Sequence, residues 1–375
     1  MDIRSTSRQI IDPHKIRPFS RLAQGIWDLR ALLAALHHAS GSLISFERGP
    51  CFVSLPPAVA VPVAVPVAVP VAVPVAVPVV APEINKDTGT GKICVQVSWL
   101  KRDVLLFANS IGCTAADELH FLYELHPQFA AFPTYPIILP FKHTDIEVTD
   151  FYARSGAEPI PGVPKFDSKR VVDGQRKMEF LKPLPVTSHG RKFEIRSKVL
   201  GVYDKGKPGS VVETESLLVD AETNEAYTRA VGSGFYIGQG GWGGPKGPKD
   251  PAYPPPTDRK PDAISTLQTT LETAHLYRLN GDYNPLHATP EPGKAMGFGG
   301  PIIHGLFSWN STANAVLHSL GGSDPQNFRE FQARFASPVK PGDKLVTEMW
   351  RMGGGKDGSG FEEVRFTTKV EGGKL

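Results

Sequence analysis

The spacing of hydrophobic residues divides the chain beyond residue 92 into two similar series of elements. In the first series, apolar residues spaced three and four apart predict a short helix at 103–111 and another at 117–125. Alternating apolar and polar residues then predict strands at 192–203, 211–219 and 226–237, separated by turn-forming residues. Helices followed by antiparallel strands favour an α+β fold over a doubly wound parallel sheet.

A similar order recurs after a stretch that is rich in glycine and proline. Residues 238–262 have the composition of a linker. Apolar residues spaced three and four apart then predict an amphipathic helix at 304–320. Further strands are predicted at 344–352 and 360–370. Two halves that each combine helix with antiparallel strands suggest an internal duplication.

The first quarter of the chain shows neither the three-to-four-residue spacing of a helix nor the alternation of a strand. Between Pro56 and Pro82 the sequence is almost a pure Val-Pro-Val-Ala repeat. The repeat is apolar, but it cannot form a regular transmembrane helix, because a proline in every turn removes an amide donor and clashes with the turn before it. An extended spacer or a partner-binding segment fits better. We therefore predict a low-complexity, disordered leader, a first domain, a linker and a second domain, at 1–92, 93–237, 238–262 and 263–375.

The composition excludes several classes of protein. The 41 basic and 38 acidic residues give a net charge of +3 over 375 residues, which is too balanced for a nucleic-acid binder or a polybasic membrane binder. The cysteines Cys51, Cys94 and Cys113 are odd in number and lack C-x-x-C spacing, so they predict neither a disulfide framework nor a zinc knuckle. The linker glycines are not followed by the Gly-Lys-Ser/Thr of a phosphate loop.

Candidate chemistry lies in the turn-rich stretch 277–305. Gly281 and Asn284 disfavour regular structure, so Asp282 and His287 are predicted on a turn that can bring both side chains to one side. A carboxylate and an imidazole can hold one water between them and exchange protons with it near neutral pH, with the amide of Asn284 fixing the geometry. On spacing alone, the competing interpretation is that Asp282 caps a turn and His287 packs in the core.

Gly305 is the second candidate feature of this stretch. It lies where the helix predicted after Pro301 begins, so its amide is one of the unpaired donors of a first helical turn. Such an amide, at the positive end of the helix dipole and without a side chain in the way, suits a developing enolate oxygen. Alternatively, Gly305 only lets the helix pack closely against the sheet.

Three segments of this stretch carry a resemblance to a known family. Tyr277-Arg278-Leu279, Asp282-Tyr283-Asn284-Pro285-Leu286-His287 and Pro301-Ile302-Ile303-His304-Gly305-Leu306 resemble the signature of the hydratase 2, or MaoC-like dehydratase, family. The similarity is closest to the (R)-specific enoyl-CoA hydratase domain of peroxisomal multifunctional enzyme type 2 and its stand-alone fungal relatives. It runs from about Asp103 to the end of the chain.

The resemblance implies a fold and a reaction. It implies a tandem hot-dog fold, each unit a helix wrapped by an antiparallel sheet, with the second unit catalytic and the first binding the acyl tail. The implied enzyme is a hydro-lyase that adds water reversibly, in syn fashion, to trans-2-enoyl-CoA and gives (3R)-3-hydroxyacyl-CoA in fatty acyl or secondary metabolism. Asp282 and His287 would activate the water, Asn284 would orient them, and the Gly305 amide would polarise the thioester. No metal and no redox cofactor is expected.

The resemblance also implies which residues contact the acyl-CoA substrate. They are Asp173, Gly174, Lys205, Tyr283, Pro285, Leu286 and Phe335. Asp173 stands where relatives usually have histidine. Two other function classes stay open at this point: an acyl-CoA-binding hot-dog protein without catalysis and, third in order, a thioesterase.

The final three residues bear on localisation. Gly373-Lys374-Leu375 resembles the Ser-Lys-Leu peroxisomal signal, which the import receptor reads. The alternative is a shortened last strand, in which case the cytoplasm is expected. The predicted partners are therefore an acyl-CoA, a second copy of the chain in a homodimer and the import receptor, with no nucleic acid and no membrane span.

Overall fold

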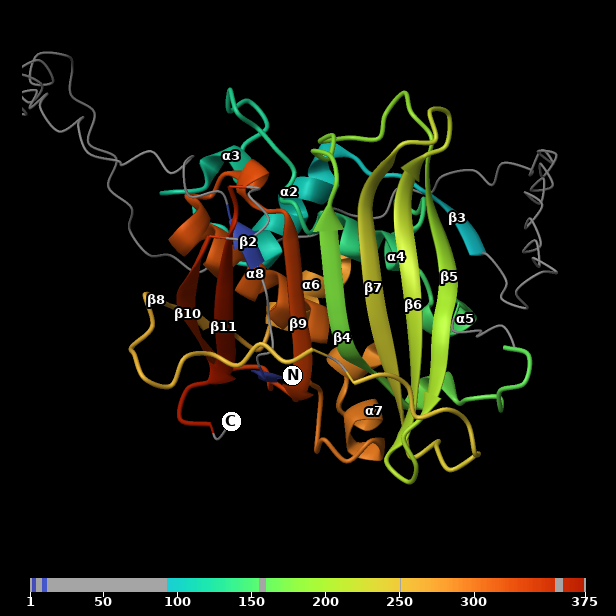
Figure 1. Ribbon diagram of the computed structural model, residues 1–375. Helices are drawn as coiled ribbons and strands as arrows, with labels where there is room; N and C mark the ends of the chain where they lie inside the picture. The colour runs from blue at the N-terminus through green and yellow to red at the C-terminus, as the bar shows by residue number, and fades with distance from the viewer. Residues whose placement is uncertain are drawn as a thin grey trace, which may run out of the picture. The chain divides into compact units, whose positions relative to one another are not determined.

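The computed structural model describes residues 2–4, 9–11, 93–154, 160–249, 251–354 and 360–373. Within these ranges, eleven strands form one antiparallel sheet in the order β3-β5-β6-β7-β4-β9-β1-β11-β10-β8, with β2 beside β9 and β11 (Figure 1). The strands are β1 (Asp2–Arg4), β2 (Gln9–Ile11), β3 (Ile93–Val97), β4 (Val171–Phe180), β5 (Phe193–Asp204), β6 (Gly209–Asp220), β7 (Ala226–Ile237), β8 (Ala263–Gln268), β9 (Glu330–Ser337), β10 (Lys344–Gly354) and β11 (Glu362–Val370).

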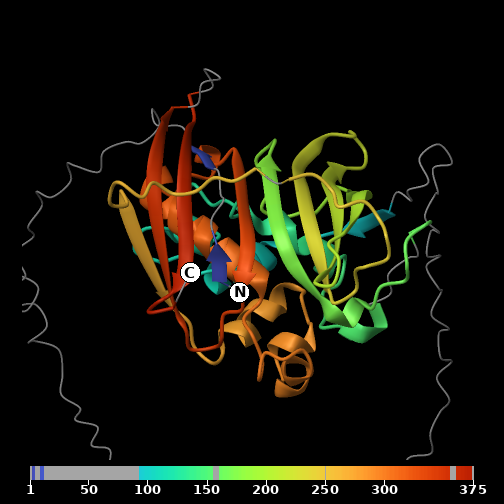
Figure 2. The ribbon, with the colours of Figure 1, turned by 60° about the horizontal axis from the view of Figure 1, so that its bottom comes forward.

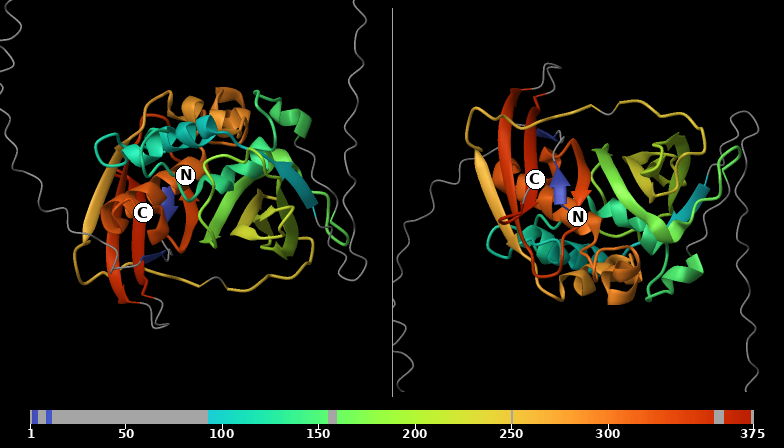
Figure 3. Two further views of the ribbon diagram at one scale, coloured as in Figure 1. Left: turned by 90° about the horizontal axis from the view of Figure 1, so that it is seen from above. Right: turned by 90° about the horizontal axis from the view of Figure 1, so that it is seen from below.

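The helices lie on one side of this sheet, and the linker crosses its other side (Figures 2 and 3). The α-helices are α2 (Lys101–Ser110), α3 (Leu119–Leu122), α4 (Leu139–Lys142), α5 (Phe151–Arg154), α6 (Thr273–Tyr277), α7 (Pro290–Ala295) and α8 (Gly305–Gly321). The 3-10 helices are η2 (Tyr135–Ile138), η3 (Ser168–Arg170), η4 (Arg278–Asn280), η5 (Pro285–His287) and η6 (Pro325–Asn327). Among the residues drawn as ribbon, none of the helices has the length and apolar character that a membrane crossing requires.

The two halves share one strand order, which confirms the predicted α+β tandem fold. The first half runs β3-β5-β6-β7-β4, and the second runs β8-β10-β11 and then, beyond one intervening position, β9. The inner edge strands β4 and β9 pair directly, from Gln175 opposite Arg334 to Glu179 opposite Glu330, so the two sheets are continuous. Side chains from both halves therefore meet along the β4–β9 seam.

The position between β11 and β9 is filled from the N-terminus. In the first half, β7 holds the equivalent position. In the second half, β1 pairs with β9 and β11, and β2 pairs with the same two strands. These six residues form strands within the range predicted as the leader. The sequence did not predict them, because a three-residue strand is too short to show a period of two. The Val-Pro-Val-Ala repeat and the other leader residues lie outside the described residues.

The central helix differs between the two halves. In the second half it is α8, 17 residues long, which lies against β8, β9 and β10. Its Trp309 packs edge-on against Phe331, with ring centres 4.7 Å apart, and Phe331 stacks on Phe366. In the first half, the described residues between β3 and β4 form the ten-residue α2 and the shorter α3, η2, α4, α5 and η3. None of these described helices reaches the length of α8.

Candidate active site

Residues 281–287, here called the catalytic turn, are held from both halves of the chain. The preceding Asn280 is buried and its amide donates to the Tyr277 carbonyl (2.8 Å) and to the Ser110 hydroxyl of α2 (2.9 Å). Gly281 has φ +126°, and a Cβ there would lie 2.8 Å from the backbone nitrogen and Cα of Lys142. Glycine is required at this position by both the conformation and the space. The first half therefore presses directly on the turn that carries the candidate chemistry.

Asn284 shapes the turn through its side chain. Its amide oxygen accepts from the Leu286 N–H (3.0 Å) and caps η5, the 3-10 turn that carries His287. Its own backbone N–H donates to Oδ1 of Asp282 (3.3 Å). Pro285 occupies the first position of η5, where no amide donor is needed. One asparagine thus links both candidate catalytic groups.

His287 is buried and its tautomer follows from its hydrogen bond. Nδ1 lies 2.9 Å from the Ile302 carbonyl oxygen. Because a carbonyl can only accept, Nδ1 carries the proton of the neutral ring and Nε2 keeps a lone pair. Burial lowers the pKa of His287 to about 4, so the ring is neutral near pH 7. A buried, neutral imidazole whose Nε2 keeps its lone pair can accept a proton from a bound water.

The pKa of Asp282 is shifted in the opposite direction from that of His287. Burial raises the pKa of its carboxyl group to about 7, while the Asn284 N–H acts to lower it. Donor atoms of Asp282, His287 and His304 lie within 4.8 Å of one another. That spacing suits one water that contacts both the carboxyl group and the imidazole. The structure therefore brings together the predicted acid–base pair on one turn.

His304 is a site residue that the sequence analysis did not select. Its ring stacks on His287 with centres 3.8 Å apart, and its Nε2 donates to the Asp282 carbonyl oxygen (3.1 Å). Burial and the neighbouring His287 hold the pKa of His304 well below its usual value. The sequence feature that could have identified His304 is its position directly before Gly305 in the family signature. His304 connects the start of α8 to the catalytic turn.

Gly305 is the first residue of α8, as predicted, and His304 is its N-cap. The N–H of a first helical residue has no partner within its own helix. A Cβ on Gly305 would lie 3.4 Å from the Phe335 ring and 3.8 Å from Cβ of Asp173. The absence of a side chain therefore keeps the approach to this amide open between β4 and β9.

The predicted substrate contacts fall into two groups. Asp173 and Phe335 lie beside Gly305, and Gly174 follows Asp173 in β4. The second group, Tyr283, Pro285 and Leu286, belongs to the catalytic turn. Leu286 is buried, and the Tyr283 ring lies under the Arg278 guanidinium at 5.2 Å. The packing of Leu286 is as consistent with support of the turn as with a substrate contact.

Lys205 lies apart from this cluster, at the same end of the sheet. The pairs Val171–Tyr236, Tyr236–Ser210 and Ser210–Asp204 place the start of β4 and the end of β5 at one edge, with two strands between them. The exposed Lys205 ammonium donates to the Lys246 carbonyl in the linker (2.5 Å). At about 4.8 Å per strand, Lys205 is roughly 15 Å from Asp173. A ligand that touches both must be long.

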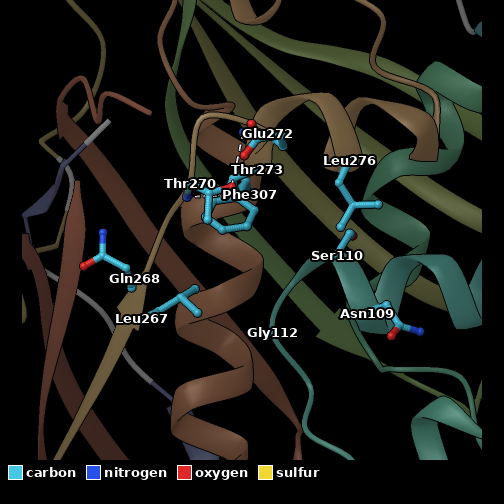
Figure 4. A pocket seen from close by; sticks show the side chains of 10 residues that line it. All are labelled: Asn109, Ser110, Gly112, Leu267, Gln268, Thr270, Glu272, Thr273, Leu276 and Phe307. Carbon is cyan, nitrogen blue, oxygen red and sulfur yellow. Dashed lines mark hydrogen bonds between the residues drawn. The ribbon is translucent and has the colours of Figure 1, made fainter. Parts of the chain in front are cut away.

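A cavity of about 270 Å³ lies between α2 and elements of the second half (Figure 4). Figure 4 shows that α2 contributes Asn109 and Ser110 to its lining, while the second half contributes Leu276 and Phe307, among others. Ser110 is also the residue that binds Asn280. The cavity lining therefore includes a residue that holds Asn280, the neighbour of the catalytic turn.

The donor set at the site is also one that metals accept. Asp282, His287 and His304 offer one carboxylate and two imidazoles, a combination that zinc takes in proteins. The expectation of a metal-free reaction is therefore a prediction that needs its own test.

The fold and the site define a class of protein. An antiparallel sheet around a central helix, with an Asp–His pair on a turn and a free amide at the helix start, is the arrangement of a hot-dog hydratase or dehydratase. The MaoC like domain matches residues 253–373, and the MFE-2 hydratase 2 N-terminal domain matches residues 98–238. The chain belongs to the MaoC-like dehydratase family.

Individual relatives agree with this assignment. A probable dehydratase of Ajellomyces capsulatus is 57% identical over 286 residues, covering 74% of this chain and 76% of that one. A probable enoyl-CoA hydratase 2 of Dictyostelium discoideum is 34% identical over 259 residues, covering 69% and 83%. The crystal structure of a MaoC-like dehydratase from Phytophthora capsici superposes with a TM-score of 0.62 at 33% identity, covering 74% of this chain and 95% of that one.

Proposed function

We propose that this protein is an (R)-specific 2-enoyl-CoA hydratase that interconverts trans-2-enoyl-CoA and (3R)-3-hydroxyacyl-CoA. The observation that carries the proposal is the convergence of Asp282, His287 and the Gly305 amide at one place. An acid, a base and an oxyanion donor are the three functions that hydration of an enoyl thioester requires. Relatives whose names include enoyl-CoA hydratase 2 support the same reaction.

The geometry gives each group a role. Nε2 of His287 accepts a proton from water while the water oxygen bonds to C3 of the enoyl group. The electron pair of the C2=C3 bond moves toward the thioester oxygen, which the Gly305 amide stabilises. The protonated carboxyl group of Asp282 then donates its proton to C2, and the proton on His287 passes to Asp282 through the next bound water, which restores both groups. Because both groups lie on one turn, the hydrogen and the hydroxyl add to the same face, and the reverse sequence eliminates water.

The pH dependence of hydration is the first expected result. Concerted acid–base catalysis needs one proton on the pair, which holds between the pKa of His287 near 4 and that of Asp282 near 7. We expect kcat/KM to fall roughly tenfold per pH unit above about pH 7. Initial rates at substrate concentrations below KM, with folding checked by circular dichroism at each pH, measure this limb. A rate that rises through pH 7 would instead assign both proton transfers to an Asp282 carboxylate.

The substrate is proposed to lie across both halves. Thioester binding at Gly305 with the nucleotide end near Lys205 follows the sheet edge that carries Asp173. The acyl tail is assigned to the first half, since its described helices are all shorter than α8, the long helix of the second half. The first half would therefore determine whether the enzyme accepts a fatty acyl or a secondary-metabolite acyl substrate.

Incubation of the purified full chain with a medium-chain trans-2-enoyl-CoA tests the proposal. Loss of the conjugated enoyl thioester without release of free CoA is the expected result. Release of free CoA would assign a thioesterase, and tight binding without turnover would assign an acyl-CoA-binding protein. Activity that survives dialysis against a chelator would support the metal-free reaction, and loss of activity restored by zinc would overturn it.

For localisation we propose the peroxisome, with the import receptor as the partner. The support is the Gly-Lys-Leu end of the sequence together with relatives named as peroxisomal enzymes; the last two residues lie outside the described part. A fluorescent protein fused to residues 360–375 is expected to give punctate signal that coincides with a peroxisomal marker. Diffuse signal would contradict the proposal. A homodimer is likewise proposed and is measured by sedimentation.

A further inference from the structure

A bulge in β4 turns Asp173 toward the site of the second half. Asp173 pairs with Gly234 and Gln175 with Ser233, so Gly174 has no partner on β7. A Cβ on Gly174 would lie 2.9 Å from the Ser233 hydroxyl, which leaves no room for a side chain. Bulges redirect neighbouring side chains. Here the bulge sets Cβ of Asp173 3.8 Å from the position of a Cβ on Gly305.

Arg176 of the same strand binds this carboxylate. Its Nε and Nη2 atoms lie 3.1 Å and 2.5 Å from Oδ1 of Asp173. The two side chains are only 25% and 21% exposed. A Cβ on Gly232 would overlap the Arg176 guanidinium, so β7 provides glycine where the arginine folds across it. The Arg176 carbonyl also accepts from the Trp309 indole of α8 (3.3 Å), which fixes the strand against the helix.

The position of Asp173 creates an electrostatic problem. The Asp173 carboxylate, on a side chain whose Cβ lies beside Gly305, opposes the negative charge that forms on a thioester oxygen there, and solvent screening is weak in a partly buried site. Other ionisable groups that interact with the acid–base pair or with His304 are Arg278, Tyr277 and His275. His304, the N-cap of α8, is neutral because burial holds its pKa well below the usual value. Arg176 is the cation in direct contact with Asp173.

We propose that Arg176 is a positioning residue of this site, which neutralises Asp173 and holds its carboxylate beside the Gly305 amide so that a bound acyl-CoA thioester can take up negative charge. This inference rests on the proposed hydratase function. It makes the first half an electrostatic component of the active site in addition to its role in tail binding. It also explains how an acidic residue is accommodated next to an oxyanion site.

A rescue experiment tests the pair. Arg176→Gln is expected to lower kcat for hydration roughly tenfold, because an unpaired carboxylate remains. Asp173→Asn removes the same charge, so adding it to Arg176→Gln is expected to raise kcat again, to the level of Asp173→Asn alone. Lys177→Gln is the matched control, since Lys177 faces the other side of β4 and pairs with Glu179 and Glu330. A double variant as slow as Arg176→Gln would overturn the proposal.

The alkaline limb of the pH profile separates an electrostatic role from a structural one. Asp173 raises and Arg176 lowers the pKa of Asp282, so Arg176→Gln should move the limb to higher pH and Asp173→Asn to lower pH. A structural effect would lower kcat with the limb unmoved, which would contradict the proposal. If wild type does not hydrate enoyl-CoA, the proposed function fails. The pair is then tested by the carboxyl ¹³C titration of Asp282, which must shift in the same two directions.

Discussion

Asp282→Asn is expected to lower kcat for hydration of a trans-2-enoyl-CoA by roughly 10³-fold, the scale of a lost general acid. The amide keeps an oxygen for the Asn284 N–H but has no acidic proton to give to C2. His287→Ala is expected to cause a similar loss, and the double variant should be little worse than either single one, because the two groups act as a unit. Single-turnover rates measure the effect on chemistry.

The stability of the same variant provides its control. The folded protein keeps a proton on Asp282 between pH 3.8, where the unfolded chain loses it, and about pH 7. Wild type therefore loses stability as the pH rises through this window. Asparagine resembles the protonated form, so Asp282→Asn should be more stable than wild type by up to about 4 kcal/mol above pH 7, with no difference near pH 4. An inactive variant that is less stable at pH 8 would point to misfolding instead.

Gly305→Pro is expected to lower kcat by roughly 10²- to 10³-fold, the usual cost of one oxyanion donor. Proline is well tolerated at the first position of a helix, where the missing N–H has no helical partner. His304, the preceding residue, has φ −54° and ψ 132°, a conformation that proline permits. The substitution thus removes the amide proton and leaves α8 in place.

Gly305→Ala is the matched control for the added bulk. Alanine keeps the N–H and brings a Cβ to 3.4 Å from the Phe335 ring, a contact that a small ring shift relieves. We expect a loss of less than about tenfold, mainly in KM. Equal losses in the alanine and proline variants would mean that space, and not the amide proton, is what Gly305 contributes.

The sequence predicted the strands with a clear alternation and a turn at each end. Residues 226–237 are predicted and found as β7 with the same bounds, and the predicted helix 304–320 differs from α8 by one residue at each end. The strands β3, β4, β8 and β9 were not predicted. β4 carries Asp173, Gln175, Arg176 and Lys177 within a few residues because it lies at the seam, where its charges pair with neighbouring side chains instead of facing solvent.

The sequence predicted the part of the site that lies on one turn, but not the part that the first half contributes. Asp282 and His287 belong to one turn, so their proximity follows from local sequence. The contributions of Ser110, Lys142, Arg176 and Asp173 come from the first half, more than 100 residues away, and depend on the β4–β9 pairing and on a glycine at 281. No local pattern encodes such contacts. The predicted helix at 117–125 is found only as the four-residue α3, with turns before and after it.

The configuration of the product tests the central claim most directly. Wild-type protein should convert a trans-2-enoyl-CoA to 3-hydroxyacyl-CoA that is entirely the (3R) isomer by chiral chromatography, while Asp282→Asn and His287→Ala give no detectable product on the same time scale. Formation of the (3S) isomer, of a racemate, or of equal product by all three proteins would contradict the account.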